Sequence, residues 1–448
     1  MNDIGCAHSL SYRKWLWIAI FAVFIVVHTP KDKIRIICEH GVGFVSEKSK
    51  SIENIIGDKD QMVLNLTKFA IHIKKLVFII SMVILLIPLT NSLKRASFLW
   101  DPKNLRKRFI RSGIVFLLLS ILVFPMELSG YGWQYAKMSL SPFAMNSGWL
   151  YRRLLNPAIA YFFGFQGRFL FYVLSLGIVF VLIYLIMAYF EFEEVEVNLI
   201  DILSIMTCSF VILNFMSQGF PDPLMFIMFL IALIATDSYE SRLAVITLAL
   251  LVHEASVFII GPIILFFFPK KDAFKCFLVI AIYFGLFLLS YLVNFEEFMK
   301  TYIVLNNKSA FDWIMEYPIR EIGGWIASYK LLWIVIIYGM LKMFKSNDLN
   351  RALFVVCMVI ISPVVMNLMT FDVSRHTGWG ALALLMSYSY LRKSGYGKKA
   401  FLKFVMFVNI LIPSIFVGTN AGFRPPADFG LYPWLYKITG LQRFLSGF

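Results

Sequence analysis

Residues 241–268 read SRLAVITLALLVHEASVFIIGPIILFFF, an apolar run that is interrupted by the pair His253-Glu254. A helix that spans a membrane needs about 20 apolar residues, so the run is long enough for one crossing. An ionised side chain at the bilayer centre costs about 2.5–3.5 kcal/mol on insertion scales. We therefore expect the helix to break at His253-Glu254 into a hairpin of two half-helices, with one straight helix as the alternative.

The hairpin halves would each be about 18–20 Å long at the rise of an α-helix, which is shorter than a hydrocarbon core of about 30 Å. Such short helices are stable only when they pack inside protein or line a watery cavity. We therefore expect the hairpin to pack inside the bundle or to line such a cavity.

The rest of the chain has the same apolar character. Of its 448 residues, 59% are hydrophobic and 15% are charged, whereas a typical soluble domain is about 25% charged. The sequence predicts an all-α, polytopic integral membrane bundle with about 12–13 transmembrane segments. With the hairpin region, the apolar segments lie near residues 15–29, 76–92, 109–126, 167–190, 200–216, 222–236, 241–268, 276–294, 331–345, 352–371, 377–391 and 402–419.

The net charge of +15 is concentrated in short connections between apolar segments. Residues 93–111, 269–275 and 392–403 are strongly basic, and basic loops stay in the cytoplasm. All three fall on one side of the membrane only if residues 241–268 form the hairpin. This pattern predicts a cytoplasmic N-terminus, and it argues against nucleic acid as a partner.

With this topology, the unusual polar groups gather on the outer side of the membrane. Charges of both signs beside short helices are typical of a polar cavity, and we expect them to border one outward-facing cleft. The groups are Glu127, Arg152 with Arg153, Asp222, His253 with Glu254, Asp372 with Arg375 and His376, and Arg424.

Each group also has a structural interpretation. The pairs Arg152-Arg153 and Arg375-His376 could anchor to lipid headgroups, and Asp222 could be a helix N-cap. His253-Glu254 could be a structural pair, and it lacks the second histidine of a zincin motif. Glu127 could be a carboxylate at the membrane boundary. The five cysteines have no paired spacing, so the sequence predicts no metal site.

Residues 127–165 resemble the first outer loop of GT-C membrane glycosyltransferases. In that loop an acidic residue follows a membrane helix, and a tyrosine and a Tyr-x-x-Ala-like segment come next. The matching residues here are Glu127, Tyr131 and Tyr135-Ala136. The family acid is usually Asp, so Glu127 departs from the pattern.

The resemblance extends over residues 112–392. Three further segments are similar to patterns in related bacterial membrane proteins and polysaccharide polymerases, as is Tyr151-Arg-Arg-Leu-Leu-Asn-Pro. The three are Phe220-Pro-Asp-Pro-Leu, Leu251-Val-His-Glu-Ala and Asp372-Val-Ser-Arg-His. This implies a GT-C-like core at 112–419, preceded by a two-helix segment at 1–111 with a polar loop at 30–75, and followed by an extracytoplasmic tail at 420–448.

The resemblance implies an enzyme of the bacterial inner membrane that moves a sugar from a polyprenyl-phosphate carrier to a glycan or lipid acceptor on the extracytoplasmic face. Glu127 would be the acceptor base, and arginines suit phosphate because their planar fork binds oxygens in pairs. A divalent cation is a candidate cofactor without a clear ligand set. The implied catalytic residues are Glu127, Asp222 and Glu254, and the implied substrate-binding residues are Tyr131, Arg152, Arg153, His253, Asp372, Arg375 and His376.

Two other functions stay open at this point. A polymerase or ligase of lipid-linked glycans, like an O-antigen polymerase, would share the outward arginines and histidine but use two lipid-linked substrates. A transporter or flippase would also use short, broken helices and buried charge. Transporters often contain internal repeats, and none is visible in this sequence.

Overall fold

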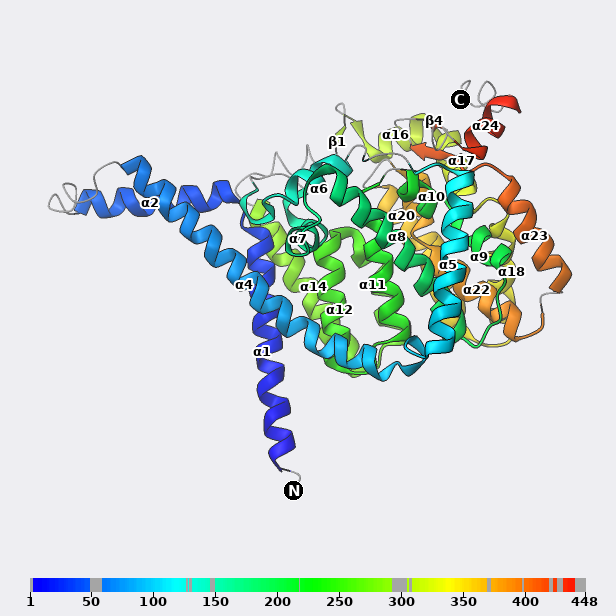
Figure 1. The fold of residues 1–448 in the computed structure, drawn as a ribbon, viewed down its shortest axis with the longest axis horizontal. Coiled ribbons are helices and arrows are strands. Elements are labelled where there is room, and N and C mark those ends of the chain that lie inside the picture. The colour runs from blue at the N-terminus through cyan, green and yellow to red at the C-terminus, as the bar shows by residue number, and fades with distance from the viewer. Residues whose placement is uncertain are drawn as a thin grey trace.

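The computed structural model is a bundle of helices (Figure 1). Its only described sheets are two antiparallel pairs, β1 (Val304–Leu305) with β2 (Lys308–Ser309) and β3 (Phe416–Gly418) with β4 (Gly422–Arg424). The structure describes residues 3–48, 59–125, 128, 131–145, 150–216, 218–291, 304–305, 308–368, 372–396, 399–418, 422–424 and 430–439.

Several helices have the length and composition of membrane spans. Four described helices are long and apolar enough to cross a bilayer, or up to six if each of two bent pairs is one span. The four are α4 (Lys59–Arg95), α8 (Gly167–Phe192), α14 (Lys270–Tyr291) over its first 20 residues, and the continuous stretch Leu349–Asn367. The chain is therefore an all-α membrane bundle, as the composition predicts.

Other apolar segments form shorter helices. The expected segment 200–216 is broken at Thr207-Cys208 into two helices of 8 residues each. The last expected segment, 402–419, is helical only to Leu411, because Pro413 disfavours helix at the residue before it. The shorter helices are α9 (Leu199–Met206), α10 (Ser209–Met216), α11 (Asp222–Ile234), α18 (Leu332–Lys345), α22 (Ala381–Lys393) and α23 (Lys399–Leu411), whereas α5 (Pro102–Leu122) has 21 residues.

The predicted break in residues 241–268 is present. Helix α12 (Tyr239–Val252) ends at His253, which is extended at φ −159°, and α13 (Val257–Phe267) follows a short 3₁₀ turn. Arg242, in the first turn of α12, lies 5.3 Å from the ring of Phe268, directly after α13. The beginning of α12 and the end of α13 are therefore neighbours, so the two half-helices form a hairpin with His253 at its tip.

The three basic connections meet at one end of the bundle, opposite that tip. Arg95, from the first connection, bonds to Asp237 at 2.6 Å, just before α12. Lys275, from the second, lies 4.4 Å from the ring of Tyr239. Partial burial raises the pKa of Asp237, but hydrogen bonds from Ser92 and Arg95 lower it by more, so the pKa ends below its usual value.

The acidic last turn of α8 and the residues directly after it join the first connection to the third at this same end. Arg108 lies 3.4 Å from Glu191, and Lys393 lies 3.2 Å from Glu193. We call this region, with its three basic connections, the basic end, and the region around the hairpin tip the site end. Helices α1, α5, α8, α11, α12, α18 and α22 run between the two ends.

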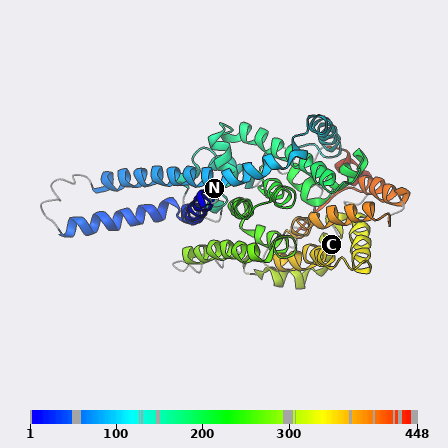
Figure 2. The same cartoon turned by 90° about the horizontal axis from the view of Figure 1, so that it is seen from below.

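At the site end two helices turn sideways. Helix α2 (Lys31–Lys48) is bent by 89° from α1 (Asp3–His28), and α17 (Pro318–Tyr329) is bent by 81° from α18. Helix α2 and the first half of α4 lie side by side and project from the bundle (Figure 2). The stretch 30–75, expected to be a polar loop, is thus helical over its described residues 31–48 and 59–75, which form this arm.

Candidate functional site

The first buried ion pair of the site end joins Asp222 to Arg375. Asp222 is the first residue of α11, and Arg375 lies on the short helix α21 (Val373–Gly378). The Arg375 Nε and Nη2 atoms donate to the two Asp222 carboxylate oxygens at 2.6 and 2.7 Å. Both side chains are buried. This two-bonded arrangement is the strongest geometry for an arginine and a carboxylate.

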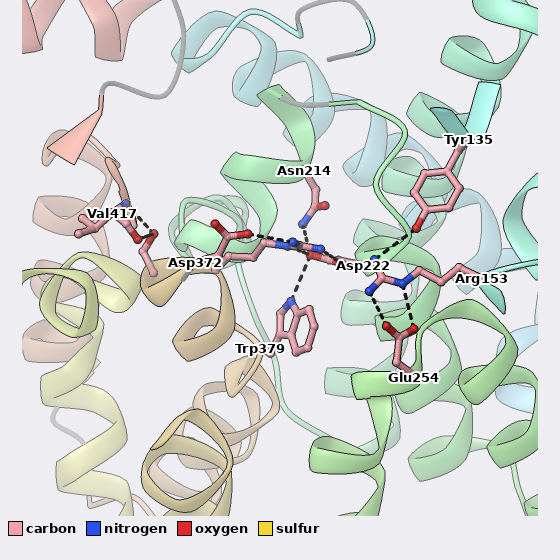
Figure 3. A network of polar contacts seen from close by, with 10 residues as sticks. Tyr135, Arg153, Asn214, Asp222, Glu254, Asp372, Trp379 and Val417 are labelled. Carbon is pink, nitrogen blue, oxygen red and sulfur yellow. Dashed lines mark hydrogen bonds and ion pairs between the residues drawn. The ribbon is translucent and has the colours of Figure 1, made fainter. Parts of the chain in front are cut away.

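Further donors surround the same carboxylate. The Trp379 indole donates to Asp222 at 3.1 Å, and the Asn214 amide donates at 3.5 Å (Figure 3). On its other side, Arg375 contacts Asp372 at 3.2 Å. The Asp222 carboxylate therefore accepts hydrogen bonds from Arg375, Trp379 and Asn214. It is not a helix N-cap, because the N-cap residue of α11 is Pro221 and no side chain makes a cap bond there.

The second buried ion pair joins Arg153 to Glu254. The Arg153 Nε and Nη2 atoms donate to the two Glu254 oxygens at 2.9 and 2.6 Å, and both side chains are 9% exposed. The Tyr135 hydroxyl accepts a third, longer bond from Arg153 at 3.4 Å (Figure 3). Glu254 is at the hairpin tip, whereas Arg153 directly follows the 3₁₀ turn Leu150–Arg152.

Two histidines and one tryptophan connect the pairs. The rings of His253 and His376 meet the Trp379 ring edge-on, at 5.3 and 4.9 Å between centroids. His253 Nδ1 also lies 3.7 Å from Glu254. Because Trp379 bonds to Asp222, the two ion pairs belong to one network, which we call the arginine network.

Tyr131 and Phe220 line the same region. The Arg375 guanidinium lies 4.7 Å from the centre of the Phe220 ring, and that ring meets Tyr131 edge-on at 5.7 Å. An arginine over an aromatic face is stabilised by the ring's negative face. Tyr131, predicted from the outer-loop resemblance, is thus separated from Arg375 by the Phe220 ring, which contacts both.

Close backbone packing positions helix α6 (Tyr131–Met138) against the turn that precedes Asp222. A Cβ atom on Gly132, in this helix, would lie 2.1 Å from the Gln218 carbonyl oxygen. Gly219 has φ of +95°, a conformation that glycine adopts without strain. Helix α6 therefore packs directly on the turn that leads to Asp222.

Burial distinguishes the arginines from lipid anchors. Arg152, Arg153 and Arg375 are 1%, 7% and 7% exposed, so their guanidinium groups do not extend to lipid headgroups. Arg152 lies over the rings of Phe287 and Tyr151, at 4.5 and 4.7 Å.

The structure thus brings together most of the predicted site residues. Asp222, Arg375, Asp372, His253, Glu254, Arg153, His376 and Tyr131 all lie in or beside the arginine network. Arg152 is next to Arg153 in the sequence, but its guanidinium lies over the rings of Tyr151 and Phe287, outside the arginine network. Glu127 lies outside the described residues. Within the described chain, no three His, Cys, Asp or Glu side chains are grouped to hold a metal ion.

Sequence reasoning missed several members of the site end. Trp379 follows Arg375 by one helical turn, and Asn214 is an amide in an apolar helix, a weak signal of a polar interior. Lys330 was also missed. It is buried at the bend between α17 and α18. Its Nζ atom donates to Thr207, Ser414 and the Ile412 carbonyl at 2.9–3.2 Å.

Chemically, the arginine network holds two guanidinium groups in fixed orientations and places two imidazole rings beside them. Asp222 and Glu254 each give both carboxylate oxygens to an arginine, so in this arrangement they position a cation.

No family model, no curated protein and no solved structure matches this chain.

Proposed function

We propose that this chain is a GT-C-type membrane glycosyltransferase with about 12–13 membrane segments, counting the short helices. It would move a sugar from a polyprenyl-phosphate carrier to a glycan or lipid acceptor at the extracytoplasmic face of a bacterial inner membrane. The observation that supports this most is the buried arginine network at the end of the bundle opposite the three basic connections. Basic connections face the cytoplasm in membrane proteins, so the network would face outward.

The chemistry of the network suits phosphoryl-linked leaving groups. When the sugar is transferred, negative charge develops on the phosphate of the carrier, and fixed cationic donors stabilise such charge. Asp222 and Glu254 would hold Arg375 and Arg153 in place for this role, which makes them positioning residues on this proposal. His253 and His376 would orient the acceptor hydroxyl, and Glu127 would take its proton.

The direct test is turnover. Purified protein is incubated with a radiolabelled polyprenyl-phosphate sugar and a crude acceptor-lipid extract, and label in the acceptor is measured. Transfer of a single sugar supports the proposal. Transfer of a whole glycan between two lipid carriers would instead indicate a polymerase or ligase, and movement of the intact donor across proteoliposomes without transfer would indicate a flippase.

Two variants separate the proposed roles. Glu127→Gln keeps size but removes basicity, so turnover should fall about 10²–10⁴-fold with donor binding unchanged. Arg375→Lys keeps charge but loses the paired donors, so donor binding should weaken as well. Arg95→Lys at the basic end is the matched control for the arginine change. Near-normal turnover in Glu127→Gln would exclude this residue as the base.

Orientation is tested separately by labelling. Lys271→Cys and Ser394→Cys place thiols in the second and third basic connections. In intact cells both should resist a membrane-impermeant thiol reagent and react after the membrane is opened. Reaction of position 271 from outside would contradict the proposed orientation.

A further inference from the structure

One face of helix α4 carries a row of large apolar side chains that are exposed on the bundle. The row alternates steps of three and four residues, the spacing that keeps side chains on one face of a helix. Exposed apolar patches of this extent mark a surface that meets a partner or a membrane. We call the row the α4 stripe, and its members, 37–63% exposed, are Leu66, Phe69, Ile73, Leu76, Ile80 and Val83.

The two halves of the stripe lie in different parts of the protein. Ile80 and Val83 belong to the apolar segment 76–92 of a helix that can span a bilayer, where outward side chains face lipid. Leu66, Phe69 and Ile73 lie within the arm. Because α4 is one uninterrupted helix over these residues, the face that meets lipid in the bundle continues along the arm.

The length and direction of the arm helices place them along a membrane surface. The 37 residues of α4 are about 55 Å long at the helical rise, whereas a helix tilted by about 40° crosses a core of about 30 Å in about 39 Å. About ten residues of α4 therefore exceed a single crossing. Helix α2 is bent by 89° from α1, which runs between the two ends, so α2 lies parallel to the bilayer surface.

Two hydrogen bonds fix the arm to the bundle at its base. Lys74 Nζ donates to the Thr29 carbonyl oxygen at 2.7 Å, directly after α1. Lys75 Nζ donates to the Tyr161 hydroxyl at 2.9 Å, in helix α7 (Leu155–Phe162). The arm is thus held beside α7 at the site end (Figure 1), which is the level of one membrane surface.

The arm also has polar faces. Lys68 and His72, four residues apart on α4, are exposed beside the stripe. On α2, Ile37 is 67% exposed and lies roughly opposite the exposed ion pair of Arg35 with Glu39, since each is two residues away along the helix. An apolar face next to a charged face is typical of helices that lie in a membrane interface, buried about 5–10 Å deep.

The side chains of the stripe favour lipid over a second helix. Inside a membrane, helices associate through small residues that let their backbones approach closely, because lipid tails are as apolar as leucine. The α4 stripe consists only of leucine, phenylalanine, isoleucine and valine. Fluid acyl chains can fill such an irregular surface, whereas these side chains would keep the backbone of a second helix at a distance.

We propose that α2 and residues 59–75 of α4 form an interfacial arm that lies on the lipid leaflet at the site end. Leu66, Phe69 and Ile73 contact acyl chains, and Lys68 and His72 lie at the level of the headgroups. This inference requires only the membrane bundle, and it holds whatever reaction the site end performs.

Spin labels on the full-length protein test the position of the arm. Phe69→Cys and Lys68→Cys are made in a variant whose five native cysteines are replaced by alanine, and each is labelled with a nitroxide and reconstituted in vesicles of phosphatidylethanolamine and phosphatidylglycerol. Oxygen concentrates in lipid and a nickel chelate stays in water, so their collision rates with the label report its depth. The ratio of oxygen to nickel collisions should be several-fold higher at position 69 than at position 68.

Ile80→Cys is the matched control on the same stripe, and its high oxygen rate shows that the cysteine-free protein is inserted in the bilayer. Equal, high nickel rates at positions 68 and 69 would overturn the proposal, since the arm would then project into water. Low rates for both reagents at position 69 would also overturn it and would indicate that a second copy covers the stripe. Ile73→Cys gives an independent reading if Phe69→Cys unfolds.

Discussion

One ion pair at each end of the bundle has the same kind of geometry in different surroundings. At the basic end, the side chains of Arg95 and Asp237 are 59% and 49% exposed, whereas at the site end the side chains of Arg375 and Asp222 are 9% and 0% exposed. Exposed pairs stabilise proteins by about 0–1 kcal/mol. Removing one partner of a buried pair costs about 3–5 kcal/mol, because the other charge is left uncompensated. The exposed pair at the basic end should therefore contribute little to stability. The buried pair at the site end should contribute much more to holding its side chains in position.

Burial also explains why the site-end pairs are so completely bonded. Asp222 receives Arg375, Trp379 and Asn214, whereas the exposed carboxylates can also bond to water. A buried polar network is costly if any member is unsatisfied. The arginine network is consequently the region where single substitutions should have the largest effects.

The largest effect is expected for Asp222→Ala. This change leaves Arg375 buried without its main partner, so the free energy of unfolding should fall by about 3–5 kcal/mol. Thermal unfolding of purified protein in detergent, followed by tryptophan fluorescence, measures the change. A melting temperature within one or two degrees of wild type would show that Arg375 reaches another partner or water.

A paired replacement sharpens this result. Asp222→Leu combined with Arg375→Met removes both charges and keeps similar volumes, so stability should return close to wild type. Transferase activity should not return, because the cationic donor is gone. If the double variant were as unstable as Asp222→Ala, packing and not charge would explain the first result.

An intermediate effect is expected for Gly132→Ala. The added Cβ would overlap the Gln218 carbonyl oxygen at 2.1 Å, so α6 must move away from the turn before Asp222. Overpacking of this kind costs about 1–3 kcal/mol, and it should lower the melting temperature. Gly113→Ala is the control, since nothing lies within 4 Å of a Cβ there; equal behaviour of the two would contradict the close contact.

The smallest effect is expected for Arg95→Gln at the basic end. The exposed pair with Asp237 should contribute about 0–1 kcal/mol, and the contribution should shrink further in high salt. Melting curves in low and high salt measure it. A loss as large as that of Asp222→Ala would remove the contrast between the two ends.

Much of the fold follows from local sequence. The apolar runs predicted a membrane bundle, and the polar pair His253-Glu254 marked the break between α12 and α13. The hairpin further placed the three basic connections together, where the structure has them. These properties depend on hydrophobicity and charge along a few turns of chain, and that information is contained in the sequence.

Tertiary packing decided the rest. Arg153 pairs with Glu254 across 101 residues, and Arg375 pairs with Asp222 across 153; charge type alone allowed other pairings, including phosphate for each arginine. The 89° and 81° bends that turn α2 and α17 sideways were not predicted either. Pairings and bends of this kind depend on which helix faces meet, and a pattern within one segment does not contain that information.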